Sequence, residues 1–169
     1  MLKCCELMYC FELDGTLVDN VPSNSKNYFI RNIKLHNSEC AFNPNKYDIR
    51  WTLVTNRPKI DSLCIRYFCF KNGLVPCQII HLNKFKNIKN INKISEQKIK
   101  LFKDILDGKH KVLYTKNKIK RIINVCNNQT ENYYINSCRN GYEFISVNVI
   151  DFKREFFNKI VWGKVKNAR

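Results

Sequence analysis

Two carboxylates, Glu12 and Asp14, stand two residues apart directly after a short apolar run. The run, residues 7–11 (Leu-Met-Tyr-Cys-Phe), has the length of a fully buried strand, and Asp14-Gly15 ends it with a turn signal. Because alternate side chains of an extended chain point to one side, both carboxylates should project together from the strand end. A carboxylate pair of this kind can bind a cation or handle a phosphoryl group.

A second segment with binding chemistry is Leu-Val-Thr-Asn-Arg-Pro at 53–58, which closes another apolar strand candidate at 49–54. Thr55, Asn56 and Arg57 are candidates for holding a phosphate there. The purely structural alternatives stay open: Asp14-Gly15 as a simple hairpin turn, Thr55 as a helix cap, and Arg57 on a solvated face.

The stretch Glu12-Leu13-Asp14-Gly15-Thr16 resembles the first motif of the haloacid dehalogenase (HAD) superfamily, whose usual form is Asp-x-Asp-Gly-Thr, and the segment ending in Thr55 resembles the second. The resemblance covers roughly residues 7–126. A small insertion, 19–48, separates the motifs, so the resemblance is to the capless branch. It implies a Rossmann-like α/β fold, Mg²⁺-dependent phosphoryl transfer, Thr55 on the phosphoryl group, Asp14 as general acid/base, and a neutralising Lys at Lys98 or, alternatively, Lys100.

Two departures from this pattern predict a degenerate site. Glu12 replaces the nucleophilic Asp, and one extra methylene moves the attacking oxygen by about 1 Å, which can cost on the order of 10²-fold in rate. Family members end their fourth strand in acids that help hold Mg²⁺. We place this strand at His110–Thr115, so Lys116 replaces the expected acid and leaves Glu12 and Asp14 as weak metal ligands. We hypothesise that Lys116 pairs with these two carboxylates in place of the ion.

Strand candidates alternate with helical patterns, which predicts an α/β fold with a mainly parallel sheet. Strands are expected at 7–13, 49–54, 78–82 and 110–115. Helices are expected around 28–33, over 59–72 with Ile60, Leu63, Cys64, Tyr67 and Phe68 inward, over 96–106 with Ser95 as N-cap, and around 119–126. A hairpin turning at Arg139-Asn140-Gly141 should join 133–135 to 142–149, and a terminal helix over 151–166 should bury Phe152, Phe156 and Ile160. The 169 residues predict one domain, with its core at 7–126 and the hairpin and helix at 127–169.

The chain is strongly basic, with 30 Lys and Arg against 14 Asp and Glu, a net charge of +16. Residues 82–121 contain 12 Lys and 1 Arg against 3 acids, or +10. This excess favours a polyanionic partner: nucleic acid, a phosphorylated assembly or an anionic membrane surface. Aromatic residues among these lysines could stack on bases, or could face the core as we expect for Phe85 and Phe102.

Codon bias is the competing explanation of the charge. The sequence has 22 Lys, 23 Asn and 19 Ile, as an AT-rich coding sequence produces whatever the function. Such a composition suits a large DNA virus, an AT-rich bacterium or a parasite.

Nine cysteines without paired spacing and three scattered histidines exclude a disulfide framework and argue against a zinc site. No apolar run is long enough to span a bilayer, and the N-terminal residues do not form a signal peptide. We therefore expect a soluble intracellular protein, cytoplasmic or virus-associated.

Two functions remain. The first is a non-catalytic HAD-like domain, a pseudoenzyme that uses its basic surface as a binding or assembly module. The alternative is an active Mg²⁺-dependent phosphatase acting on a nucleotide, a nucleic-acid end or a phosphoprotein.

Overall fold

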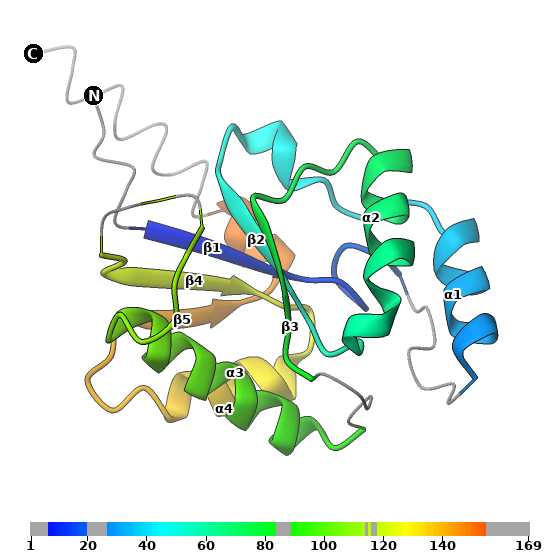
Figure 1. Cartoon of the computed structure of the whole chain (residues 1–169). Helices are drawn as coiled ribbons and strands as arrows, with labels where there is room; N and C mark the ends of the chain where they lie inside the picture. Colours follow the sequence, from blue (N-terminus) through cyan, green and yellow to red (C-terminus); the bar gives the residue numbers. More distant parts are fainter. Residues whose placement is uncertain (1–6, 20–26, 84–88, 114, 116–117, 155–169) are drawn as a thin grey trace, which may run out of the picture.

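A parallel sheet forms the centre of the computed structural model, which describes residues 7–19, 27–83, 89–113, 115 and 118–154 (Figure 1). Within these residues the sheet has five strands in the order β3-β2-β1-β4-β5, and every neighbouring pair is parallel. The strands are β1 (Leu7–Glu12), β2 (Trp51–Thr55), β3 (Gln78–His81), β4 (Arg121–Val125) and β5 (Phe144–Val147).

Helices cover both faces of the sheet, which makes a three-layer α/β/α arrangement (Figure 1). One side carries α1 (Tyr28–Asn37) and α2 (Ser62–Lys71), and the other carries α3 (Ile91–Leu106) and α4 (Gln129–Ser137). Short 3-10 helices, η1 (Pro44–Tyr47) and η2 (Lys59–Asp61), precede β2 and α2, and residues 149–154 are helical. Asn27, Asn90 and Asn128 cap α1, α3 and α4 by accepting hydrogen bonds from first-turn amides, as Asn does well at this position. None of the described helices is long and apolar enough to cross a bilayer.

Alternate residues of β1 supply the two halves of the core, as strand geometry requires. Met8 and Cys10 pack toward α3 and α4, while Phe11 packs on the other face. The Phe11 ring lies 5.6 Å from that of Trp51 and 5.3 Å from that of Phe152, both edge-on. The sheet is therefore buried on both sides, which fits the continuous apolar character of its strands.

The predicted Rossmann-like α/β fold with a mainly parallel sheet is confirmed. The strands expected at 7–13, 49–54 and 78–82 are β1, β2 and β3. The terminal helix begins by residue 149 and buries Phe152 as expected, while Phe156 and Ile160 lie outside the described residues.

The predicted fourth strand is wrong. Residues 110–113 form no strand, and β4 is Arg121–Val125, where a helix was expected. A short apolar run such as Ile122-Ile123-Asn124-Val125 fits a buried strand and a buried helix equally well by periodicity. Its β-branched residues favour the strand, and in the structure they form β4, which pairs with β1 in the sheet.

The predicted C-terminal hairpin is also wrong. Residues 129–137 form α4, and β5 runs parallel to β4, so the connection is a helical crossover. The turn signal itself is real: Asn140 and Gly141 have φ of 48° and 83°, the left-handed region that these residues tolerate. It ends the helix before β5 instead of closing a hairpin.

Two helix predictions need correction. Helix α3 is capped by Asn90, and Ser95 lies inside it, donating its hydroxyl hydrogen to the Ile91 carbonyl. In α2 the buried residues are Ile65, Phe68 and Cys69, whereas Leu63 and Tyr67 are exposed, as is Ile60 in the preceding η2. A short helix with apolar residues around its whole circumference does not specify which face is inward.

All seven cysteines in the described part of the chain are free thiols, in keeping with the absence of paired spacing. Burial raises the pKa of Cys10 and of Cys69 to about 12, so both remain protonated near neutral pH. They behave as small core residues.

Candidate functional site

Polar side chains gather at the carboxyl edge of the sheet, where the connections from β1 and β4 leave in opposite directions. This switch point is where open α/β sheets bind ligands. The contributing residues are Glu12 and Asp14 from the end of β1, Thr55 and Arg57 from the end of β2, Cys126 after β4, Lys98 from α3 and Glu131 from α4.

The loop after β1 is tightly wound and fastened to the end of β4. The Gly15 amide donates to the Val18 carbonyl at 2.8 Å, and Gly15 has φ of 80°, which a side chain would strain. The Asn127 amide donates to Thr16 Oγ1, and its side-chain Nδ2 donates to the Gly15 carbonyl, both at 3.1 Å. This fastening fixes where the two acids point.

Glu12 belongs to a buried ionic cluster. Lys98 Nζ lies 3.2 Å from Glu12 Oε1 and also bonds Glu131 Oε1, and its side chain is fully buried. The Cys126 thiol donates to Glu12 Oε2 at 2.7 Å. Both carboxylate oxygens of Glu12 therefore already have a protein partner.

Electrostatics keep the central ammonium charged. Desolvation lowers the pKa of Lys98, but the Glu12 and Glu131 carboxylates outweigh it, and the net effect is a pKa well above the usual lysine value. Burial raises the pKa of Glu12, and the nearby Lys98 charge opposes that rise.

Asp14 is held by a different cation. Arg57 Nε lies 2.9 Å from Asp14 Oδ2, and its Nη2 lies 2.7 Å from Oδ1, a two-pronged geometry that is among the stronger ion pairs. The guanidinium is fully buried, and Asp14 is 18% exposed. Arg57 is thus buried on an acid of the first motif and does not lie on a solvated face.

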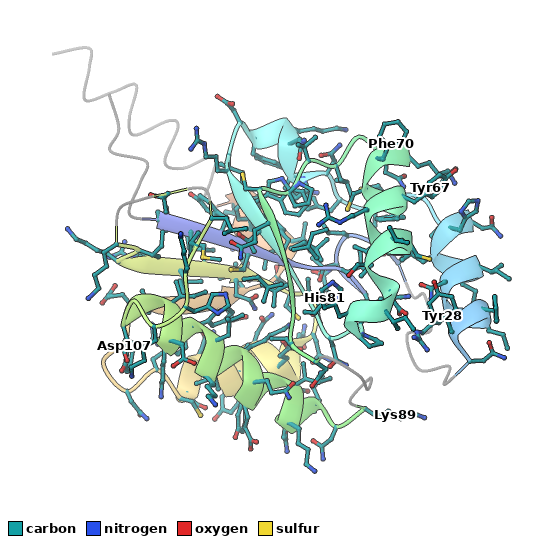
Figure 2. All side chains as sticks on the ribbon, in the orientation of Figure 1. Tyr28, Tyr67, Phe70, His81, Lys89 and Asp107 are labelled. Carbon is teal, nitrogen blue, oxygen red and sulfur yellow. The ribbon has the colours of Figure 1, made fainter. Side chains whose placement is uncertain are left out.

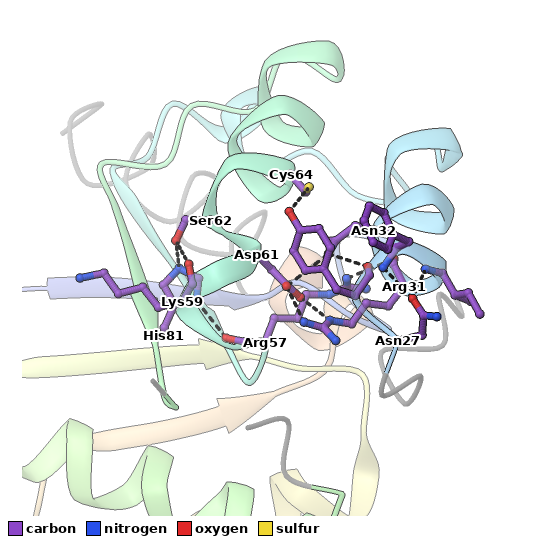
Figure 3. Close-up of polar contacts among 12 residues, drawn as sticks. Asn27, Arg31, Asn32, Arg57, Lys59, Asp61, Ser62, Cys64 and His81 are labelled. Atoms are coloured by element: carbon purple, nitrogen blue, oxygen red, sulfur yellow. Dashed lines mark hydrogen bonds and ion pairs between the residues drawn. The ribbon is translucent and has the colours of Figure 1, made fainter. Parts of the chain in front are cut away.

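The loop that carries Arg57 is fixed from two sides. Thr55 Oγ1 accepts from the Arg57 amide at 3.1 Å. The His81 ring, at the end of β3, contacts the Arg57 carbonyl through Nδ1 and Ser62 Oγ through Nε2, both at 2.9 Å (Figure 3). Since a carbonyl only accepts, Nδ1 must donate. The Thr55 hydroxyl therefore helps position Arg57 in this structure.

Asn56 lies beside this loop but is occupied differently. Its Oδ1 accepts from Asn83 Nδ2 at 2.6 Å, and Asn83 Oδ1 accepts from Gln97 Nε2 at 2.9 Å. The chain of amides links the end of β2 to α3.

A possible metal-binding cluster differs from the predicted one. Ligand atoms of Glu12, Cys126 and Glu131 lie within 4.8 Å of one another, while Asp14 pairs with Arg57. Mg²⁺ requires oxygen ligands in octahedral geometry. Here one of three donors is a thiol, whose pKa is raised by burial and then by Glu12, and the Lys98 ammonium bonds both carboxylates. This donor set does not fit Mg²⁺.

Five predicted residues meet at this edge: Glu12, Asp14, Thr55, Arg57 and Lys98. Lys100, the alternative to Lys98, is exposed. Lys116 lies outside the described residues, so the hypothesis that it pairs with Glu12 and Asp14 stays a prediction. With β4 at 121–125, the position after the fourth strand is Cys126.

Sequence reasoning missed Cys126 and Glu131. Their signal was available only through the position of β4, because residues just after a parallel strand lie at the same sheet edge as Glu12. Because the sequence prediction placed the fourth strand at 110–115, it did not bring Cys126 or Glu131 to this edge.

Comparisons with known proteins give structural likeness only. No family model and no curated protein matches the sequence. The fold is similar to a chain in the solved "Structure of Pnkp1/Rnl/Hen1 complex", with a TM-score of 0.50 and 14% sequence identity. The match covers 86% of this chain and 47% of that chain, so this chain spans about half the length of its structural neighbour. At this identity the likeness shows a shared fold.

Proposed function

We propose that this chain is a diverged, capless member of the HAD superfamily whose phosphatase site has lost its activity. One observation carries the proposal: Asp14, the acid at the general acid/base position, is bound through both oxygens by the buried guanidinium of Arg57.

The chemistry of phosphoryl transfer explains why these pairs matter. A nucleophilic carboxylate needs an oxygen for in-line attack; Lys98 lies on one oxygen of Glu12, as the resemblance implies, but the Cys126 thiol donates to the other. A general acid/base must exchange a proton with the reacting group, and Asp14 is bound through both oxygens. The site holds three acids and two cations, so its formal charge is −1. The acids are Glu12, Asp14 and Glu131, and the cations are Lys98 and Arg57. That leaves little charge to attract a divalent ion.

Hydrolysis of 4-nitrophenyl phosphate, with and without Mg²⁺, tests the loss of activity. We expect the native protein to show no turnover above buffer. The matched gain-of-function variant is Glu12→Asp with Cys126→Asp. It places Asp at the two positions where this chain differs from the family motifs, and it should show more Mg²⁺-dependent turnover than the native chain. Native turnover that requires Mg²⁺ and disappears in Asp14→Asn would overturn the proposal.

An active phosphatase on a nucleotide, nucleic-acid end or phosphoprotein is the second candidate. It is favoured by Lys98, which lies 3.2 Å from Glu12 as the neutralising lysine of the family would, and by the partial exposure of Asp14. The hydrolysis measurement separates the two candidates directly.

We further propose that the basic surface binds a polyanion, such as nucleic acid or a phosphorylated assembly. Exposed basic residues gather around the segment before β4: Lys109, Lys111, Lys118, Lys120 and Arg121. Phosphate contacts of this type release counterions, so affinity should fall steeply with salt.

A single-stranded oligonucleotide titrated at several salt concentrations tests this binding role. The slope of log affinity against log salt should decrease by about one for each lysine lost, as in Lys118→Gln and Lys120→Gln. A flat salt response would remove nucleic acid from consideration.

A further inference from the structure

Helix α1 is inverted relative to an ordinary surface helix. Its polar residues Arg31 and Asn32 are buried with Leu35, whereas Phe29 and Ile33 are 71% and 58% exposed. The inward side is satisfied by Asp61: Arg31 Nε and Nη2 each lie 2.7 Å from one of its oxygens, and Asn32 Nδ2 lies 3.2 Å away (Figure 3). Amphipathic surface helices normally direct apolar residues to the core.

Helix α2 also presents apolar residues outward. Leu63, Tyr67 and Phe70 are 78%, 45% and 83% exposed, and Figure 2 shows Tyr67 and Phe70 on the outer part of this helix. Their i, i+4, i+7 spacing aligns them along one side of α2. That side is opposite the core-facing residues of the helix.

The two rows adjoin because α1 and α2 lie side by side and run in the same direction (Figure 1). Near their beginnings Tyr28 Oη lies 3.7 Å from Cys64 Sγ. Near their ends the His36 ring stacks on Tyr67, with centroids 4.6 Å apart and planes 6° from parallel. Positions 29, 33 and 36 repeat the spacing of 63, 67 and 70.

The exposed apolar residues on these two adjoining helices, which we call the apolar face, are Phe29, Ile33, Leu63, Tyr67 and Phe70. Contiguous exposed apolar surface of this kind marks an interaction site more often than a free surface.

The exposed charged side chains on the two helices that carry the apolar face are of one sign. Every exposed charged side chain of α1 and α2, both described throughout, is basic: Lys34, Arg66 and Lys71. A second copy of a chain with net charge +16 would be repelled. The sequence at 155–169 carries four basic residues and one acid, so it matches the sign of this rim and does not complement it.

We propose that the apolar face docks an acidic amphipathic helix of a partner protein. Such a helix supplies apolar residues at i, i+3/i+4 and i+7 for the two rows and carboxylates for Lys34, Arg66 and Lys71. The row on α2 runs from Leu63 to Phe70, which is about 10 Å along the helix at about 1.5 Å per residue, a length that two turns of a third helix match. Two parallel helices with exposed rows present the ridges and the groove into which a helix packs. No residue of the apolar face is one of the residues that make up the candidate functional site.

An anionic bilayer could also accept an apolar face with basic residues beside it. A membrane surface, however, typically binds one amphipathic helix that lies in its plane. At the centre of the apolar face the Tyr67 ring stacks on His36 and is 45% exposed, whereas Leu63 and Phe70 on either side of it are 78% and 83% exposed. This geometry favours a protein helix.

Fluorescence anisotropy with the full chain tests the docking. The probe is a synthetic labelled helix with Leu along one side and Glu elsewhere; the controls are a shuffled peptide of equal composition and a version with Lys for Glu. We expect the acidic amphipathic peptide to bind at least about tenfold more tightly than either control. Leu63→Gln with Phe70→Gln should weaken it by about tenfold or more. Tyr133→Gln, a change at a residue 79% exposed on α4, should leave it unchanged.

Three results would overturn the proposal: equal binding of the shuffled peptide, unchanged binding by the Leu63 and Phe70 variant, or binding equally weakened by Tyr133→Gln. Sedimentation with phosphatidylserine vesicles that depends on Leu63 and Phe70, without peptide binding, would assign the face to a membrane surface instead.

Discussion

Lys98→Ala is expected to lower the free energy of unfolding by about 3–5 kcal/mol, because removing one member of a buried ionic cluster leaves uncompensated charge. The side chain is fully buried and bonds both Glu12 and Glu131. Without the ammonium, two carboxylates face each other in the interior, and one must take up a proton. Urea unfolding followed by tryptophan fluorescence gives the change.

Lys100→Ala is the matched control, since Lys100 is exposed two residues further along α3. Its effect should stay within about 0.5 kcal/mol. If Lys98→Ala does not fold, Lys98→Met with Glu131→Leu keeps the test open, because replacing a buried ion pair by apolar residues is far less costly than breaking it. Equal effects of Lys98→Ala and Lys100→Ala would contradict the structural role given to Lys98.

Asp61→Ala should cost a comparable amount, about 3–5 kcal/mol, for the same physical reason. Asp61 is fully buried and accepts two bonds at 2.7 Å from Arg31 and one at 3.2 Å from Asn32. The substitution removes the inward attachment of α1, so the apolar face should also lose its geometry. Thermal or urea unfolding measures the first effect, and peptide anisotropy the second.

Glu143→Ala serves as the control for Asp61→Ala, because the Arg121 to Glu143 pair is 60% and 65% exposed and such pairs contribute about 0–1 kcal/mol. The double variant Arg31→Met with Asp61→Leu should recover most of the lost stability. A single Asp61→Ala variant as stable as Glu143→Ala would show that the pair does not hold α1.

Local signals were enough to predict the first half of the fold. The turn at Asp14-Gly15 and the segment after Thr55 are strong signals for the end of a strand. The carboxyl ends of these two strands meet because β1 and β2 are parallel neighbours. Lys98 was predicted from the family resemblance, which implies a Lys at the start of the helix before the fourth strand, and the structure brings it to Glu12.

The second half failed where local signals are degenerate. Ile122-Ile123-Asn124-Val125 and the run at 110–115 both contain short apolar stretches, and pairing with β1 selects the former as a strand. That choice also decides that Cys126 and Glu131 reach the site. The pairing of Asp14 with Arg57 joins positions 43 residues apart, and no spacing rule predicts it.

The Glu12, Lys98 and Glu131 cluster has a consequence for regulation. A dissociable ion comes and goes with its concentration in solution, and its occupancy is set by an equilibrium. The positive charge between Glu12 and Glu131 is the ammonium of Lys98, which is covalently part of the chain and cannot dissociate from it. We therefore expect the arrangement of this edge to be the same with and without a chelator in solution.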